Sequence, residues 1–286
     1  MTRPALPLDA AFDPAELAAA VSAWRAQGLS IGFVPTMGAL HRGHIALAQQ
    51  ALSLCDRVVA SVFVNPAQFA PGEDFDAYPR TLEADAEKLS QAGCHLVYAP
   101  TAAAMYPKGF ATTISLTGPA EGLESAARPH FFAGVATVVT KLLNQVKPDK
   151  AVFGEKDYQQ LLVIRRLVAD LNMGVEIVAG ETVREPDGLA LSSRNAYLSP
   201  DERARAGKLN IILAEFASAL RAGAAVKTAQ ADALKAAEAV FDNVDYIEAR
   251  YAKTLAALPD GALDQPARVL AAVRVGRTRL IDNRDV

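Results

Sequence analysis

The sequence predicts an α/β protein with a Rossmann-like parallel sheet, helices on both faces, and a smaller C-terminal α+β domain. In the first two-thirds of the chain, short apolar runs alternate with longer helical patterns. Strands that are apolar throughout are typical of a parallel sheet covered on both faces. The last third is rich in helical patterns and ends in paired β-like runs. We therefore predict one domain at residues 1–183 and a second at 184–286.

Each predicted element of the first domain has its own signal. The run RVVASVFVN (57–65) is stopped by Pro66, and the amphipathic pattern at 80–93 ends at a glycine. The predicted strands cover residues 31–35, 57–65, 95–100, 151–154 and 175–180, and the predicted helices cover residues 43–54, 80–93, 134–146 and 157–172.

The second domain opens with a capping box. Ser199 and Glu202 have the required spacing, and Pro200 occupies the first helical position. Helical patterns continue to about residue 241. The β-like runs that follow are YIEARY (246–251), ARVLAAVRV (267–275) and RLIDN (279–283), with a Gly-Arg turn between the last two.

Composition narrows the function classes. The chain has 286 residues, is 51% hydrophobic and 21% charged, and has a net charge of −3. It therefore fits a globular protein and lacks the cationic surface that tight nucleic-acid binding needs. We expect no signal peptide and no membrane span, and hence a cytoplasmic location. Cys55 and Cys94 match no metal or redox spacing.

Polar clusters follow three of the predicted strands. PTMGALHRGH (35–44) follows the first strand, NPAQF (65–69) the second and GEKDYQQ (154–160) the fourth. Ligands of open parallel sheets bind beyond the carboxyl ends of the strands. We therefore expect the three clusters to contribute to a ligand site.

The first cluster has the features of a phosphate site. Gly38 and Gly43 let the backbone approach a ligand. A helix starting near Gly43 offers unpaired N–H groups and the positive end of its dipole. His41 and His44 add donors aimed at phosphate oxygens. The alternative is that one histidine caps the helix and the other is exposed, but His-x-Gly-His at a strand-to-helix junction favours phosphate.

Two further segments add cations and hydroxyls. Lys156 precedes a predicted helix and supplies a point positive charge; alternatively it is a surface lysine beside Asp157 as a helix cap. A turn at 185–188 returns the chain to the Ser-Ser-Arg triplet at 192–194. The triplet suits phosphate oxygens, the alternative being a helix cap with an exposed arginine.

The sequence contains no serine–histidine–acid pattern, no Walker loop, no Rossmann glycine spacing and no metal-ligand cluster. Donors and cations without an evident nucleophile suit transfer at phosphorus, where catalysis is mostly positioning and charge stabilisation.

Six motifs, in order, resemble the pantothenate synthetase (pantoate–β-alanine ligase) family: PTMGALHRGH, SVFVNPAQF, DAYPRT, GVATVVTKLLNQVKPD, FGEKDYQQL and DGLALSSRN. The resemblance runs from about Ile31 to Leu198. The RLIDN run at 279–283 is similar to the C-terminal end of the family's sequences. The wider relatives are nucleotidylyltransferases and class I aminoacyl-tRNA synthetases.

The resemblance implies a two-step reaction. The carboxylate of (R)-pantoate attacks the α-phosphorus of ATP, which releases pyrophosphate and leaves pantoyl adenylate. The amine of β-alanine then displaces AMP to give pantothenate. Mg²⁺ would accompany ATP, because it neutralises charge on the leaving pyrophosphate.

The resemblance also implies site residues. Gln68 and Gln160 would hold pantoate, with Gln68 also near β-alanine, since an amide both donates and accepts hydrogen bonds. A carboxylate nucleophile needs no deprotonation, so the histidines are expected to stabilise the transition state electrostatically. The implied catalytic residues are His44, His41, Lys156 and Arg194. The implied ATP-binding residues are Met37, Gly38, Ala39, Leu40, His41, Arg42, Gly43, His44, Gly154, Glu155, Lys156, Asp157, Val183, Leu191, Ser192, Ser193 and Arg194; no metal ligand is implied.

One loop departs from the family pattern. The commoner pattern reads Arg-Pro-Gly-His-Phe, whereas this chain has Arg-Pro-His-Phe-Phe at 128–132. His130 stands in place of the glycine and Phe131 in place of the histidine.

Other functions remain as alternatives at this point. One is an adenylyltransferase that releases its adenylylated product, and another is a catalytically silent nucleotide-binding protein. A class I aminoacyl-tRNA synthetase is disfavoured by net acidity and by the lack of a tRNA-binding extension. The resemblance further implies a homodimer, and an acyl adenylate that hydrolyses in water predicts that the domain at 184–286 acts as a lid.

Overall fold

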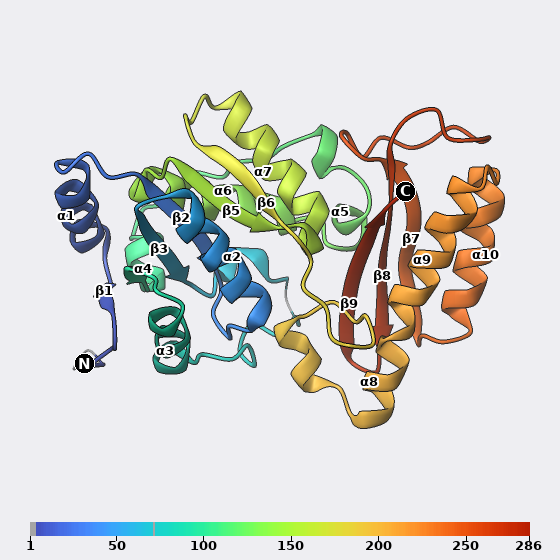
Figure 1. Ribbon diagram of the computed structural model, residues 1–286, viewed down its shortest axis with the longest axis horizontal. Coiled ribbons are helices and arrows are strands. Elements are labelled where there is room, and N and C mark those ends of the chain that lie inside the picture. Colours follow the sequence, from blue (N-terminus) through green and yellow to red (C-terminus); the bar gives the residue numbers. More distant parts are fainter. Residues whose placement is uncertain (1–3, 71) are drawn as a thin grey trace. The chain divides into compact units, whose positions relative to one another are not determined.

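The computed structural model describes residues 4–70 and 72–286, which form two compact units (Figure 1). Unit 1 comprises Met1–Leu116, Arg128–Glu155 and Val163–Glu181. Unit 2 comprises Thr117–Ala127, Lys156–Leu162 and Thr182–Val286.

Unit 1 is built on a six-stranded sheet in the order β1-β4-β3-β2-β5-β6, with every pair of neighbours parallel. The predicted α/β class with a parallel sheet is therefore confirmed. The strands are β1 (Asp9–Ala11), β2 (Ile31–Thr36), β3 (Arg57–Val62), β4 (Leu96–Tyr98), β5 (Lys150–Gly154) and β6 (Glu176–Gly180).

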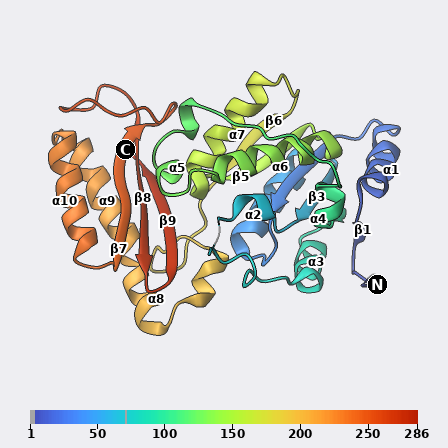
Figure 2. The same ribbon diagram turned by 180° about the vertical axis from the view of Figure 1, so that it is seen from behind.

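Helices cover both faces of this sheet, as predicted (Figures 1 and 2). Right-handed crossovers that run in opposite directions from the middle of the sheet place their helices on opposite faces. Fully buried Ala48, Val58 and Val97 belong to the core beneath one layer. One layer holds α2 (Arg42–Leu54) and α3 (Leu82–Gln91); the other holds α1 (Pro14–Arg25), α6 (Phe131–Val146) and α7 (Tyr158–Asp170).

Three local features differ from the sequence prediction. Strand β1 and helix α1 were not predicted, because three residues give no periodic signal and β1 is defined by pairing with β4. Helix α1 is capped by Asp13, whose carboxylate accepts from two backbone N–H groups. The strand predicted at 57–65 ends at Val62, because Asn65 already caps a short 3₁₀ helix, η1 (Pro66–Gln68).

Unit 2 contains the antiparallel sheet β7-β8-β9 together with helices, which confirms the predicted α+β part. Its core includes Leu213, Phe216 and Val273, all at most 2% exposed. The predicted capping box is present, since the backbone N–H of Glu202 donates to Ser199 Oγ and that of Ser199 to Glu202 Oε2. The elements are α8 (Pro200–Ala206), α9 (Lys208–Arg221), α10 (Val226–Glu238), β7 (Asn243–Tyr251), β8 (Ala267–Val275) and β9 (Thr278–Asp285).

Short helices occupy several connections. They are α4 (Ala102–Met105), η2 (Gly118–Ala120), α5 (Glu124–Ala127), η3 (Glu155–Asp157) and η4 (Ser193–Tyr197). Within the described residues, no helix has both the length and the apolarity needed to cross a membrane.

Helix α6 packs so closely on η1 that Gly134 has no room for a side chain. A Cβ at this position would overlap the carbonyl group of Ala67. We expect Gly134→Ala to lower the free energy of unfolding by about 1–3 kcal/mol, because backbone must move to relieve the overlap. Urea unfolding measures the change, with Asn144→Ala on the exposed side of the same helix as control. Equal stability of both variants would contradict the prediction.

Candidate active site

The sheet of unit 1 defines where a ligand is expected to bind. From β2 the chain proceeds through β3 to β4 on one side, whereas β5 and β6 lie on the other side of β2. The strand order therefore reverses between β2 and β5, and in open α/β sheets the crevice at such a switch point is the binding site. The loops that follow these two strands carry TMGALH and GEKD. Within unit 1 the first cluster and the 154–155 part of the GEKDYQQ cluster therefore follow the two strands at the switch point, whereas Lys156 and the residues after it belong to unit 2.

The loop after β2 is held in an unusual backbone conformation. Ala39 has a φ of 50°, in the left-handed region that a residue with a Cβ rarely adopts. The backbone N–H groups of Ala39 and Leu40 donate to the two carboxylate oxygens of Asp85, at 2.9 and 2.8 Å. Asp85 is fully buried in α3, and Thr81 Oγ1 donates to the same carboxylate. Asp85 therefore fixes the loop, a role that sequence reasoning missed.

This arrangement limits how three predicted residues, Gly38, Ala39 and Leu40, meet a ligand. The side chain of Leu40 is only 3% exposed and packs in the core of unit 1. The N–H groups of Ala39 and Leu40 are already bound to Asp85. Gly38 has a φ of 86°, and a Cβ there would lie 3.0 Å from Val62 Cγ1. These residues shape the loop, which leads directly into the histidines at the start of α2.

The two histidines form a reciprocal cap at the start of α2. His41 Nδ1 accepts from the backbone N–H of Gly43 at 3.2 Å, and His44 Nδ1 accepts from that of His41 at 3.3 Å. Their ring centroids lie 4.0 Å apart. The prediction of unpaired N–H groups at this helix start is therefore wrong for His41 and Gly43, because imidazole nitrogens accept from them.

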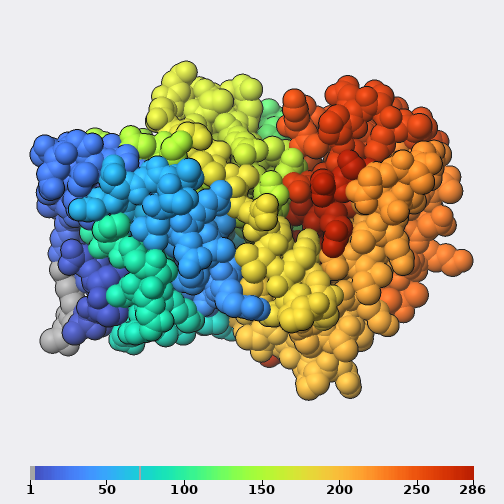
Figure 3. Space-filling model, viewed as in Figure 1, coloured from blue at the N-terminus to red at the C-terminus, as the bar shows by residue number. Residues whose placement is uncertain are grey.

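The cap also determines the tautomer of both rings. A nitrogen that accepts a hydrogen bond carries no proton, so each neutral ring has its proton on Nε2. Nε2 lies on the far edge of the ring from the capping nitrogen. Both histidines therefore cap the helix, and their role as donors to phosphate stays a prediction. Residues of α2 and α3 form part of the surface of unit 1 shown in Figure 3.

The loop after β3 is organised by a buried amide. Asn65 is 1% exposed, and its Nδ2 donates to Gln68 Oε1 at 2.9 Å and to the carbonyl of Gly134 at 3.2 Å. Its Oδ1 accepts from Tyr106 OH at 2.7 Å. Burial raises the pKa of Tyr106 to about 12, so its hydroxyl stays a donor at neutral pH. Gln68 belongs to the NPAQF cluster that the sequence predicts to contribute to a ligand site. Its amide is oriented by Asn65.

The loop that departs from the family pattern has a different interaction. Arg128 forms a two-point ion pair with Glu73, with both N–O distances 2.7 Å, and donates to the carbonyl of Gln68 at 3.0 Å. Its guanidinium lies 4.0 Å from the ring centre of Phe131, a cation–π contact. Phe131 therefore packs on Arg128 where the commoner pattern has a histidine.

Unit 2 carries Lys156, Asp157, Gln160 and the predicted residues of the 183–194 segment. Lys156 and Asp157 lie in η3, with 3.8 Å between Lys156 Nζ and Asp157 Oδ2. Gln159, next in α7, is 4% exposed and binds the backbone of the 119–124 segment through both ends of its amide. Gln160 is half-buried. Among the residues that the structure describes, its side chain is not seen to bind backbone in the way that Gln159 does.

The segment 183–194 folds as a hairpin that ends in η4. Leu191 N donates to the carbonyl of Val183, and Gly188 N closes the predicted turn on the carbonyl of Glu185. Ser192 caps η4 by accepting from the N–H of Arg194 at 3.3 Å. The capping alternative is therefore correct for Ser192, while its hydroxyl proton remains a potential donor to phosphate.

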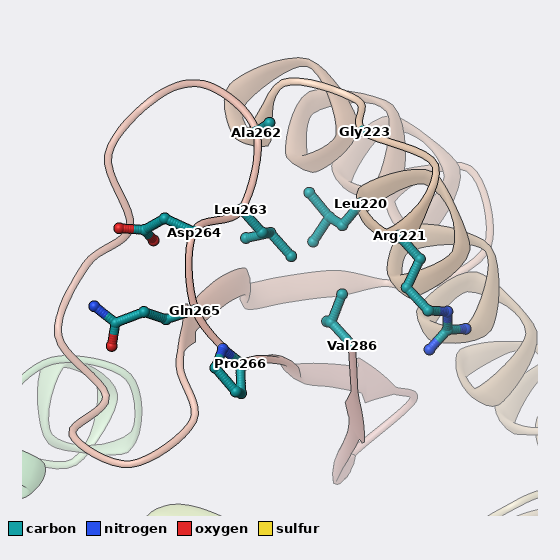
Figure 4. A pocket seen from close by; sticks show the side chains of 9 residues that line it. All are labelled: Leu220, Arg221, Gly223, Ala262, Leu263, Asp264, Gln265, Pro266 and Val286. Atoms are coloured by element: carbon teal, nitrogen blue, oxygen red, sulfur yellow. The ribbon is translucent and has the colours of Figure 1, made fainter.

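A separate pocket of about 430 Å³ lies in unit 2 between the end of α9 and the loop before β8. Figure 4 shows Leu220, Leu263 and Val286 pointing into it, whereas Asp264 points away. It contains none of the predicted nucleotide-binding residues.

Across residues 4–70 and 72–286, no group of three or more His, Cys, Asp or Glu side chains is placed to hold a metal ion.

Comparison with known proteins agrees with this geometry. The family model described as pantoate-beta-alanine ligase matches residues 10–285. The chain belongs to the pantoate–β-alanine ligase family. The expected family is thereby confirmed over nearly the whole chain, including the C-terminal part beyond the six motifs.

Individual relatives are similar to this chain over more than nine-tenths of their lengths. The pantothenate synthetase of Maricaulis maris is 67% identical over 92% of this chain and 91% of its own, and that of Rhodospirillum rubrum is 55% identical over 98% of both. Among solved structures, a pantothenate synthetase from Thermus thermophilus has a TM-score of 0.89 at 47% identity, covering 97% of this chain and 99% of its own. A pantoate-beta-alanine ligase from Francisella tularensis, complexed with beta-gamma ATP and beta-alanine, has a TM-score of 0.81 at 33% identity, covering 97% of both chains.

The cap and donor roles of His44 can be separated by substitution. His44→Asn keeps an acceptor near the Nδ1 position but lacks the distal donor, so we expect a melting temperature close to that of the unchanged protein and activity reduced about 100-fold or more. His44→Gln reaches the Nε2 position but loses the cap, so it should be less stable and more active than His44→Asn. Steady-state kinetics and thermal melts test the pair, with exposed His130→Asn as control. A fully active His44→Asn would contradict the donor role.

The loop conformation is expected to depend on the charge of Asp85. Asp85→Asn places an amide NH₂ against a backbone N–H group, so we expect a loss of about 1–3 kcal/mol in unfolding free energy and a rise in the KM for ATP. Glu83→Gln, in the exposed first turn of the same helix, is the matched control. An unchanged KM for ATP in a destabilised Asp85→Asn protein would show that the loop does not depend on this carboxylate.

Proposed function

We propose that this chain joins (R)-pantoate to β-alanine at the expense of ATP, forming pantothenate, AMP and pyrophosphate through pantoyl adenylate. Family membership over residues 10–285 carries the proposal. The residues themselves also support it, since His41 and His44 cap α2 directly after β2, Lys156 lies in η3 after β5, and Arg194 lies in η4. The Francisella relative is complexed with a nucleotide and with β-alanine, which supports binding of both kinds of ligand here. An adenylyltransferase and a silent nucleotide-binding protein are not favoured.

In the first step, the pantoate carboxylate attacks the α-phosphorus and pyrophosphate leaves with the bond electrons. The carboxylate is already ionised, so no side chain need remove a proton. The Nε2–H groups of His41 and His44 stabilise charge that develops on the phosphate oxygens. Lys156 and Arg194 add fixed positive charge, which is most effective when the side chains are held in place before the reaction.

In the second step, the neutral amine of β-alanine attacks the acyl carbon and AMP leaves. The amine nitrogen loses a proton to the departing phosphate group or to water as the amide forms. Gln68 is the proposed contact near both pantoate and β-alanine, and Asn65 orients its amide through the hydrogen bond to Oε1. Gln160 is the second proposed pantoate contact. An oriented amide lowers the entropy cost of placing the reacting groups.

Magnesium is proposed as part of the substrate, bound to the ATP phosphates. It would neutralise charge on the leaving pyrophosphate. The residues near the phosphates are donors and cations, which suits binding a metal through the nucleotide. We also keep as proposals a homodimer, a cytoplasmic location, and a lid role for residues 184–286 that protects the adenylate from water.

The proposal is tested by following AMP and pyrophosphate from Mg-ATP and pantoate, with and without β-alanine. We expect AMP formation to require both substrates and to equal pantothenate in amount. Pyrophosphate release that needs only pantoate, continues through many turnovers and ignores β-alanine would indicate an adenylyltransferase. Binding of ATP without any turnover would indicate a silent nucleotide-binding protein.

A further inference from the structure

Strand β9 contains two consecutive polar side chains that are almost completely buried. Asp282 is 3% exposed and Asn283 is 4% exposed, and both belong to the RLIDN run for which the sequence indicated no role. Successive side chains of a strand point to opposite faces, so these two cannot serve one shared contact. A buried polar group is costly unless it is hydrogen-bonded, and its partners therefore indicate what it is for.

Asn283 is bound to the backbone of the phosphate-site lysine. Its Nδ2 donates to the carbonyl of Lys156 at 2.9 Å. Lys156 lies in η3, a single turn between the end of β5 and the start of α7. Its side chain is 20% exposed. Anchoring this carbonyl fixes the Cα position from which the lysine side chain extends.

Asp282 is bound to the hairpin that leads to the Ser-Ser-Arg triplet. Its carboxylate accepts from both terminal nitrogens of Arg184, at 2.7 and 2.9 Å. The same guanidinium donates to the carbonyl of Gly188 at 2.9 Å, across the hairpin, and to that of Asn283. Bidentate pairs of this kind fix orientation as well as distance.

Strand β9 also packs directly against η4, which carries Ser193 and Arg194. Figure 1 shows the segment leading into η4 beside β9. One strand thus supports the lysine turn, the hairpin and the 3₁₀ helix. Lys156, the hairpin and η4 all belong to unit 2, so the strand provides a common scaffold for residues that are far apart in sequence.

We propose that Asn283 and Asp282 are positioning residues for ATP, Asn283 by holding Lys156 and Asp282 by holding the 183–194 segment through Arg184. The proposal deepens the proposed function and rests on it for the identity of the nucleotide. Neither side chain contacts substrate in this scheme. Their loss should therefore weaken the step that uses the triphosphate more than the step that follows it.

The test compares the two half-reactions in Asn283→Leu, which keeps the approximate shape of the side chain and removes the donor. We expect pyrophosphate release from ATP and pantoate to fall about 10- to 100-fold, because small displacements of a charged group have large effects on rate. Aminolysis of supplied pantoyl adenylate by β-alanine should change less than about threefold by the same reasoning. Ile281→Val, on the same face of β9, is the matched control and should change neither rate.

Two further variants separate positioning from folding. Asn283→Asp replaces the donor with an oxygen facing the Lys156 carbonyl, and should show the same split between half-reactions. Asp282→Asn keeps the shape but removes the charge that binds Arg184, and should also weaken adenylation. Thermal melts confirm that each variant is folded. Equal loss of both half-reactions in folded variants, or unchanged adenylation in Asn283→Leu, would overturn the proposal.

Calorimetric titration with Mg-ATP alone distinguishes this inference from the proposed function. We expect about tenfold weaker binding by Asn283→Leu than by the unchanged chain or Ile281→Val, because Lys156 is displaced. This measurement needs no turnover, so it decides the positioning proposal even if the chain forms no pantothenate. Identical ATP affinity of all three proteins would overturn the proposal.

Discussion

The structure of the site depends on the two hydrogen bonds from the backbone of the loop after β2 to the carboxylate of Asp85. They stabilise a left-handed conformation at Ala39 that would otherwise be unfavourable. Because the conformation is fixed, the chain enters α2 with His41 at the cap and His44 one turn later. The parallel sheet places the loop at the switch point, and the buried carboxylate gives it one shape. The rings of His41 and His44 are therefore held by their backbone hydrogen bonds before any ligand binds.

The same physical principle recurs in each part of the site. Asn65 orients Gln68, Asp85 fixes the loop before α2, and Asp282 and Asn283 hold the hairpin and the lysine turn. Asn65, Asp85 and Asp282 each form several hydrogen bonds, and Asn283 donates to the carbonyl of Lys156. Such groups are costly to bury and strongly directional once satisfied. They provide the rigidity that a reaction based on positioning and charge stabilisation requires.

The Arg128 loop shows how a family pattern can change without loss of a defined structure. Phe131 replaces the histidine of the commoner motif and stacks on Arg128, which also binds Glu73 and the carbonyl of Gln68. The arginine thus connects the altered loop to the glutamine proposed to contact pantoate. At this position the aromatic ring supplies a face for a cation where an imidazole would supply a hydrogen bond.

The sequence by itself determined the fold class, the order of the main strands and helices, the family, and the clusters of residues that make up the candidate site. These follow from hydrophobic periodicity, from the capping signal at Ser199, and from glycines and histidines at strand ends, all of which are local. Only the tertiary structure decided which side chains support them. Asp85 lies 45 residues from Leu40 and Asn283 lies 127 residues from Lys156, so no local pattern links them. That both histidines cap α2 is likewise seen only in the structure, although their partners lie two and three residues away in the sequence.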